Sequence, residues 1–259
     1  MRRCPECGYG WSWRLGDGRS KCRSCGTRYR LTSVWSASRL PDATKRKLVE
    51  LFVYGVPGYR LRFRNIASPK AIERFFRLVR ACCAYEEHCR EPFEGAVECD
   101  ETTIGGYRPG KRGWGAAGKV IVLGILQRDG KVQVFPVRKR DKKEVIELVV
   151  THTKPGSLYY TDEWQAYASL SVRGDHIVIR KEKGKPKGRD HINGIEGFWS
   201  YTKHWLHPYR GVPKKFLHMY LGEICYQFNH RHEDLYPLII NLLRTTQYDV
   251  TLPLLVQIG

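Results

Sequence analysis

Residues 96–106 read AVECDETTIGG, a short apolar run that ends in a pair of acids led by Asp100. Residues 157–163, SLYYTDE, repeat this arrangement and end in a second pair led by Asp162. Apolar runs of this length, bounded by polar and glycine residues, are typical of buried β-strands. The sequence therefore predicts two strands that each end in carboxylates.

The strands belong to a region, residues 91–259, in which predicted strands and helices alternate. We expect strands at 97–103, 119–126, 131–137, 158–161 and 176–180, and helices at 142–151, 164–170, 191–206 and 213–229. This order is similar to the RNase H-like fold, an α/β architecture with a mixed sheet flanked by helices. In that fold the first and fourth strands lie adjacent at the sheet centre, so Asp100 and Asp162 are expected to meet.

The helix predicted at 191–206 carries a third acid, Glu196. Lys203 follows seven residues later, two helical turns on and at almost the same azimuth, where an ammonium can reach a DNA phosphate. Asn193 lies about one turn before Glu196 and can orient a phosphate or a water. Lys203 and Asn193 would therefore allow nucleic acid to bind beside the acidic site.

Carboxylates in this pattern indicate a site for divalent cations, because hard ions such as Mg²⁺ prefer carboxylate oxygens. Phosphoryl transfer uses two such ions roughly 3.5–4 Å apart. We expect Asp100 to bridge both ions, Asp162 to hold one and Glu196 the other. Three nearby acids remain alternative ligands: Glu98, Glu101 and Glu163.

The N-terminal region, residues 1–35, contains CPECG (4–8) and CRSCG (22–26), two CxxC units that are each followed by glycine. Two such units direct four thiolates at one ion, so the spacing predicts a small ribbon around a structural Zn²⁺. The predicted ligands are Cys4, Cys7, Cys22 and Cys25. We interpret the other five cysteines as small buried hydrophobic residues.

Residues 36–90 have apolar residues at helical spacing. Ser68-Pro69 supplies an N-cap and a first-turn proline for the last of three short helices. The arrangement resembles a helix-turn-helix DNA-binding segment. The alternative is a helical connector whose charges face water. In the DNA-binding interpretation, the third helix turns four charged residues toward a major groove: Lys70, Glu73, Arg74 and Arg77.

Net charge supports a polyanionic partner. The chain carries +19 overall, and residues 1–90 hold 20 Lys and Arg against 7 Asp and Glu. Neutralising DNA phosphates releases counterions, which favours binding by such a basic region. No run approaches 18 apolar residues and the N-terminus lacks a signal-peptide core, so we expect no membrane span and a cytoplasmic location.

Four motifs together resemble the zinc-ribbon DDE transposases of prokaryotic insertion sequences, over nearly the whole chain. They are DETTIGG (100–106), GAAGKV (115–120), TDEWQAY (161–167) and NGIEGFWSYTK (193–203). The resemblance implies cleavage at the ends of a mobile element with Mg²⁺ or Mn²⁺, followed by attack of the freed 3′-hydroxyl on target DNA. It implies double-stranded DNA as partner (terminal inverted repeats and target), a homodimer bridging two ends, and a nucleoid-associated protein.

Carried over by residue, the resemblance assigns the catalytic triad to Asp100, Asp162 and Glu196, with Asn193 and Lys203 as accessory residues. Related enzymes are sometimes discussed with Asn as the third ligand. We favour Glu196, because a carboxylate binds Mg²⁺ more strongly than an amide and its helical phase matches Lys203. Two other functions remain open: a catalytically inactive, domesticated transposase acting as a DNA-binding regulator, and an RNase H-like structure-specific nuclease.

Overall fold

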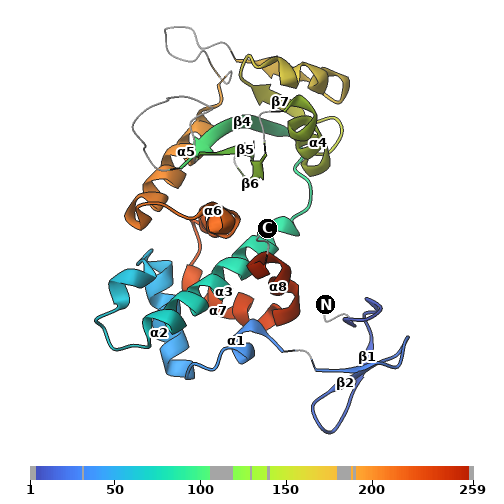
Figure 1. The fold of residues 1–259 in the computed structure, drawn as a ribbon. Coiled ribbons are helices and arrows are strands. Elements are labelled where there is room, and N and C mark those ends of the chain that lie inside the picture. The colour runs from blue at the N-terminus through green and yellow to red at the C-terminus, as the bar shows by residue number, and fades with distance from the viewer. Residues whose placement is uncertain are drawn as a thin grey trace.

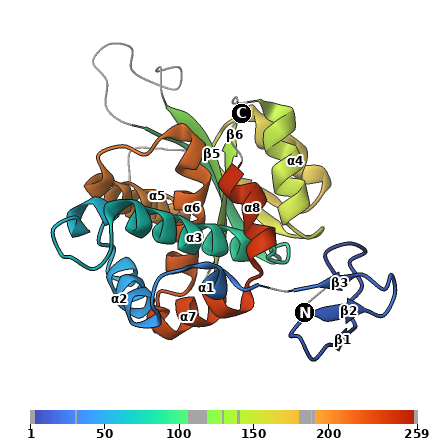
Figure 2. The ribbon, with the colours of Figure 1, turned by 60° about the horizontal axis from the view of Figure 1, so that its bottom comes forward.

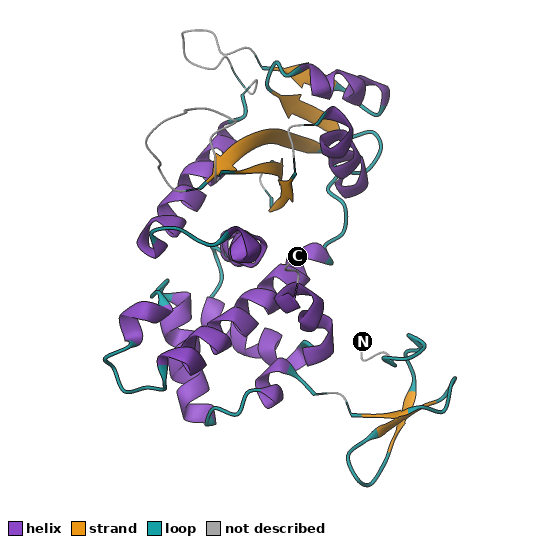
Figure 3. Ribbon diagram, in the orientation of Figure 1, coloured by secondary structure: helices purple, strands orange, loops and turns teal. Residues whose placement is uncertain are grey.

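The computed structural model describes residues 4–30, 32–105, 119–128, 130–138, 141–179, 188 and 191–256. The motif GAAGKV, whose first four residues are 115–118, therefore lies mostly outside the described residues. The chain forms a small N-terminal ribbon, a bundle of helices and a five-stranded sheet flanked by helices (Figures 1 and 3). No helix in the described part of the chain is both long and apolar enough to cross a membrane.

The ribbon is a three-stranded antiparallel sheet at the N-terminus. Its strands are β1 (Ser12–Arg14), β2 (Ser20–Cys22) and β3 (Arg28–Tyr29). A minimal core of Cys4, Cys22 and Tyr29 holds it together. So small a core favours a metal-dependent fold.

The larger sheet has the strand order β6-β5-β4-β7-β8. Its strands are β4 (Ala96–Ile104), β5 (Val120–Gln127), β6 (Val132–Val137), β7 (Leu158–Thr161) and β8 (His176–Val178). The first three form an antiparallel meander, whereas β7 pairs in parallel with β4, and β8 in parallel with β7. The prediction of an RNase H-like mixed sheet is confirmed, with the first and fourth strands of the region adjacent at its centre.

Helices cover both faces of this sheet. Helices α5 (Asn193–Leu206) and α6 (Lys214–Asn229) pack on one face, and α4 (Lys142–His152) with the 3₁₀ helix η2 (Gln165–Val172) packs on the other (Figure 1). Strand side chains alternate between the two cores, so Val122 and Leu126 face α5 while Leu123 and Ile125 face α4. The same alternation turns the neighbouring acids Asp100 and Glu101 of β4 to opposite faces of the sheet.

The helical bundle is assembled from both ends of the chain. Its members are α1 (Val34–Ala37), α2 (Asp42–Val53), η1 (Gly58–Leu61) and α3 (Pro69–His88), together with α7 (Leu235–Thr245) and α8 (Tyr248–Val256). The last two helices were not predicted. Backbone hydrogen bonds tie residues 32–34 to residues 246–248. The bundle core also includes Tyr226 of α6, a residue of the region 91–259. The predicted boundary at residue 91, between a segment 36–90 and a domain 91–259, stays a prediction.

Helix α3 begins as predicted, with the Ser68 hydroxyl accepting a hydrogen bond from the Ala71 amide at 3.3 Å. From Leu78 to Cys83 every residue is buried, because α6, α7 and α8 pack around it (Figure 2). Lys70 and Arg74 in its first turns are exposed. The buried middle of α3 cannot reach a DNA groove, whereas Lys70 and Arg74 are open to one; the helix-turn-helix interpretation stays a prediction.

Candidate active site

Asp100 and Asp162 lie where the parallel pairing of β4 with β7 ends. The last paired residues of the two strands are Cys99 and Thr161, and each aspartate is the next residue along its chain, although β4 itself continues to Ile104. Neighbouring strands are about 4.8 Å apart, so the parallel pairing brings the backbones of the two aspartates close together. Both side chains are half-buried.

Helix α5 lies directly over Asp100. The indole Nε1 of Trp199 donates a hydrogen bond to Asp100 Oδ2 at 3.0 Å. This contact requires a glycine opposite Asp100 in β5, because a Cβ on Gly124 would lie 2.6 Å from the Trp199 ring. The close approach of α5 to the sheet therefore fixes one oxygen of Asp100.

Glu196 is on the same helix, three residues before Trp199 and hence about one turn nearer the helix N-terminus. It is half-buried. Asn193, the first residue of α5, and Lys203, near its end, are both exposed. The structure thus brings Asp100, Asp162 and the helix that carries Glu196 together, and leaves Asn193 and Lys203 open to solvent along that helix.

Glu98 has a different environment from Asp100, although both side chains face α5. Its carboxylate accepts hydrogen bonds from the Ile195 amide at 2.9 Å and from Arg128 Nε at 2.9 Å. A Cβ on Gly194 would lie 2.8 Å from Glu98 Oε2, so glycine permits the close approach of the helix start. Arg128 also donates to the His191 carbonyl and lies 3.4 Å from the centre of the Tyr160 ring. Glu98 therefore holds the first turn of α5 in place.

The other two alternative ligands, Glu101 and Glu163, also differ from Asp100 and Asp162 in their surroundings. Glu101 is buried on the α4 face, where the Tyr167 hydroxyl donates to it. Burial raises the pKa of Tyr167 well above its usual value, so this phenol stays a proton donor. Glu163 is exposed, one residue past Asp162. Asp162 itself accepts a hydrogen bond from the Trp164 amide at 3.0 Å.

Comparison with known proteins shows the family of this chain. The family model of the ISXO2-like transposase domain matches residues 92–229, which span β4 to α6 and include all three acids. This chain belongs to the ISXO2-like transposase family.

Two relatives come from mobile-element backgrounds. An uncharacterized transposase-like protein of Haemophilus influenzae is 30% identical over 101 residues, covering 39% of this chain and 82% of the relative. An uncharacterized protein in the transposable element ISH50 of Halobacterium salinarum is 26% identical over 176 residues, covering 61% of this chain and 58% of the relative. The transposase therefore spans a little over half the length of its Halobacterium relative.

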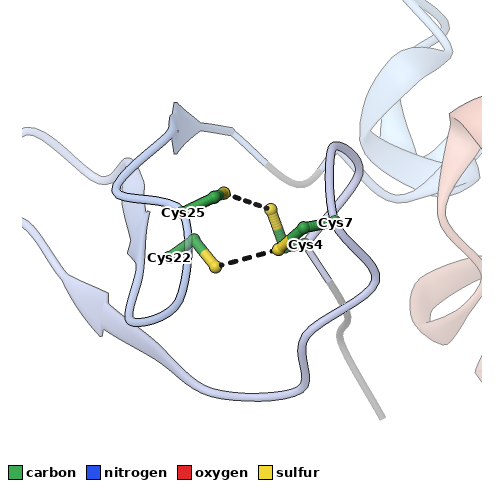
Figure 4. A group of neighbouring side chains, drawn as sticks. All are labelled: Cys4, Cys7, Cys22 and Cys25. Atoms are coloured by element: carbon green, nitrogen blue, oxygen red, sulfur yellow. Dashed lines mark hydrogen bonds between the residues drawn. The ribbon is translucent and has the colours of Figure 1, made fainter.

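The four predicted zinc ligands of this transposase form a compact cluster (Figure 4). All four Sγ atoms lie within 4.8 Å of one another, with Cys4 and Cys25 at 3.6 Å and Cys7 and Cys22 at 3.5 Å. Four sulfurs at about 2.3 Å from one tetrahedral ion would be separated by about 3.8 Å. Hydrogen bonding with the Thr27 side chain and backbone lowers the pKa of Cys25 to about 6. The residues therefore fit a structural zinc ion.

The contact of Trp199 with Asp100 was not predicted from the sequence. The side chain is buried, but its only polar atom faces the site. The available signal was its helical phase, because Trp199 lies one turn from Glu196. The pairing of Glu98 with Arg128 had no sequence signal, since the two residues are 30 positions apart.

Proposed function

We propose that this transposase cleaves DNA at the ends of its element and joins the freed 3′-hydroxyl to target DNA, with Asp100, Asp162 and Glu196 as the ligands of catalytic Mg²⁺ or Mn²⁺. The parallel pairing of β4 with β7 carries the proposal, because it sets Asp100 beside Asp162 under the helix of Glu196. Their oxygen donors suit hard cations.

Two bound ions would neutralise charge on the phosphate and activate the oxygen nucleophile of an in-line displacement. The protein's own contribution is positioning. Trp199 orients Asp100 through its indole N–H, and Glu98 with Arg128 fixes the start of α5 and hence Glu196. Preorganised ligands of this kind cost no reorganisation during the reaction.

DNA contacts extend along α5 in this account. Exposed Lys203 binds a phosphate beside the metal site, and exposed Asn193 orients a phosphate or water at the helix start. The net charge of +19 supports binding of terminal inverted repeats and target DNA. Zn²⁺ at Cys4, Cys7, Cys22 and Cys25 folds the ribbon, and two copies of the chain bridge the two element ends at the nucleoid, in the cytoplasm.

A strand-transfer assay with the element's own terminal repeats tests the proposal. Asp100→Ala, Asp162→Ala and Glu196→Ala should each lower the rate on the order of a thousandfold, as removal of a main electrostatic contribution does. Glu163→Gln, next to Asp162 but exposed, is the matched control and should stay active. Asn193→Ala is expected to lose less than Glu196→Ala; the reverse order would make Asn193 the third ligand.

Two other outcomes define the alternatives. If wild-type protein binds the repeats but neither cuts nor joins them with Mg²⁺ or Mn²⁺, the chain is a DNA-binding regulator. If it cuts branched or hybrid duplexes without preference for terminal repeats, it is a structure-specific nuclease.

A further inference from the structure

The segment between α2 and α3, residues 58–65, has the sequence GYRLRFRN and contains three arginines and no acid. Arg60, Arg62 and Arg64 are all exposed. Phe63 between them is 80% exposed. We call residues 58–65 the Phe63 loop.

The Phe63 loop is anchored to the bundle core and to the region that follows α5. Leu61 is buried in the bundle core. The Tyr59 hydroxyl donates to the Pro208 carbonyl at 2.9 Å, just after the end of α5. At the preceding turn, a Cβ on Gly55 would lie 3.0 Å from the Trp205 ring of α5. The loop therefore sits against the C-terminal end of the helix that carries Glu196 and Lys203 (Figures 1 and 2).

The chemistry of the loop matches duplex DNA. Guanidinium groups pair with phosphates, and proteins that kink DNA insert an apolar side chain between base steps. Arg62 lies 4.7 Å from the centre of the Phe63 ring, so the cation and the apolar group are presented together. A second copy of this chain would bring the same three arginines against these three, and like charges oppose that contact.

We propose that the Phe63 loop binds duplex DNA, with its arginines on phosphates and Phe63 inserted at a base step. The proposal adds this loop to the DNA-binding surface of the proposed function, and it does not depend on the catalytic roles of Asp100, Asp162 and Glu196.

Fluorescence anisotropy with a random-sequence duplex, over a series of salt concentrations and without added Mg²⁺, tests the arginines. The triple variant R60A/R62A/R64A should lower the slope of log affinity against log salt by up to about 2.7, or about 0.9 for each lost phosphate contact. The triple variant R39A/K142A/K143A removes three exposed cations elsewhere and is the charge-matched control. Equal slopes for the two triple variants would overturn the proposal.

Phe63 is tested with the same duplex carrying one central mismatch. Unstacking a base step costs a few kcal/mol, and a mismatch lowers that cost, so wild type should prefer the mismatched duplex by about tenfold. Phe63→Ala should lose this preference and keep the wild-type salt slope, and Phe63→Leu should retain most of it. Persistence of the preference in Phe63→Ala would contradict insertion.

Two controls separate this proposal from others. Phe63→Ala that binds both duplexes as wild type does but loses self-association in sedimentation would assign the loop to a contact between copies and overturn the proposal. Asp100→Ala should lose strand transfer and keep the preference for the mismatched duplex. Failure of the catalytic proposal therefore leaves the binding result intact, and failure of the loop proposal leaves the Asp100→Ala activity result intact.

Discussion

The helical bundle and the sheet each contain a buried arginine–glutamate pair, and the two pairs differ in what surrounds them. In the bundle, Arg80 of α3 and Glu223 of α6 meet at 2.6 Å with side chains 2% and 0% exposed. At the sheet, Arg128 and Glu98 meet at 2.9 Å with side chains 15% and 2% exposed. The first pair is enclosed by aromatic rings, whereas the second lies two residues from Asp100 under the start of α5.

The difference shows that the same interaction can serve folding in one region and site geometry in another. Arg80 packs against Tyr220 at 3.9 Å and donates to Tyr209, so it links α3 to the α6 region. Glu98 holds the helix whose Trp199 and Glu196 belong to the site. Disrupting the first pair should therefore lower stability, and disrupting the second should lower both stability and activity.

The largest expected effect is loss of zinc from the ribbon, which contains neither pair. Zinc binding to small metal-dependent modules is worth about 10–16 kcal/mol in apparent free energy. Cys22→Ser should therefore abolish zinc retention and make residues 4–30 sensitive to trypsin, while the bundle and the sheet stay resistant, because the ribbon core is separate from theirs. The control is Cys89→Ser, which should retain its zinc. Cys89 lies outside the ribbon and is exposed, so the prediction of a buried cysteine is wrong at this position.

Arg80→Met tests the bundle pair. It leaves Glu223 buried without its cation, which costs about 3–5 kcal/mol of unfolding free energy in urea titrations. Strand transfer per folded molecule should stay near wild type. The double variant R80M/E223L removes both charges and should recover most of the stability; a double variant as unstable as Arg80→Met would contradict this account of the pair.

Arg128→Met tests the sheet pair. The pair is partly open to solvent, so we expect a smaller loss of about 1–3 kcal/mol. Strand transfer should nevertheless fall about tenfold or more, since supporting residues around metal ligands have effects of 10–100-fold. A variant that loses stability but keeps full activity would show that Glu98 and Arg128 only serve folding.

Two glycines on α5 are expected to show the smallest effects on stability and activity. A Cβ on Gly194 meets Glu98, whereas one on Gly197 has no atom within 4 Å. Gly194→Ala should cost about 1–3 kcal/mol and lower activity, because the helix start must shift. Gly197→Ala should stabilise by about 0.5–1 kcal/mol, because alanine favours the helix. Thermal melts and strand-transfer rates of the two variants check both; equal effects would contradict the close seating of α5.

The sequence predicted the sheet region well and the bundle poorly, for a physical reason. The strands that lead to Asp100 and Asp162 are local signals in the sequence, and their expected adjacency followed from the similarity to the RNase H-like fold. The bundle depends on contacts such as Ser33 with Gln247, which join the two ends of the chain. Helix α8 contains Pro253 and has little amphipathic pattern, whereas α7 follows an Asp234 N-cap and is clearly amphipathic, a signal that the sequence analysis did not use.

The same limit applies within the site. Glu98 and Asp100 share one strand face, so sequence alone cannot separate a supporting acid from a proposed ligand. The separation comes from Arg128 and the Ile195 amide, which reach Glu98 from other elements. Tertiary contacts, rather than spacing, show that these two acids have different surroundings.

A change of ligand chemistry at Asp100 tests the central claim most directly. Asp100→Cys replaces a hard oxygen donor by a thiolate, which binds Mg²⁺ poorly and accepts softer ions more readily. Strand transfer by Asp100→Cys should be lost with Mg²⁺ and at least partly restored with Mn²⁺, whereas Asp100→Ala stays inactive with both. Equal activity of Asp100→Cys with the two ions, or wild-type activity with Mg²⁺, would contradict a metal-binding role for Asp100.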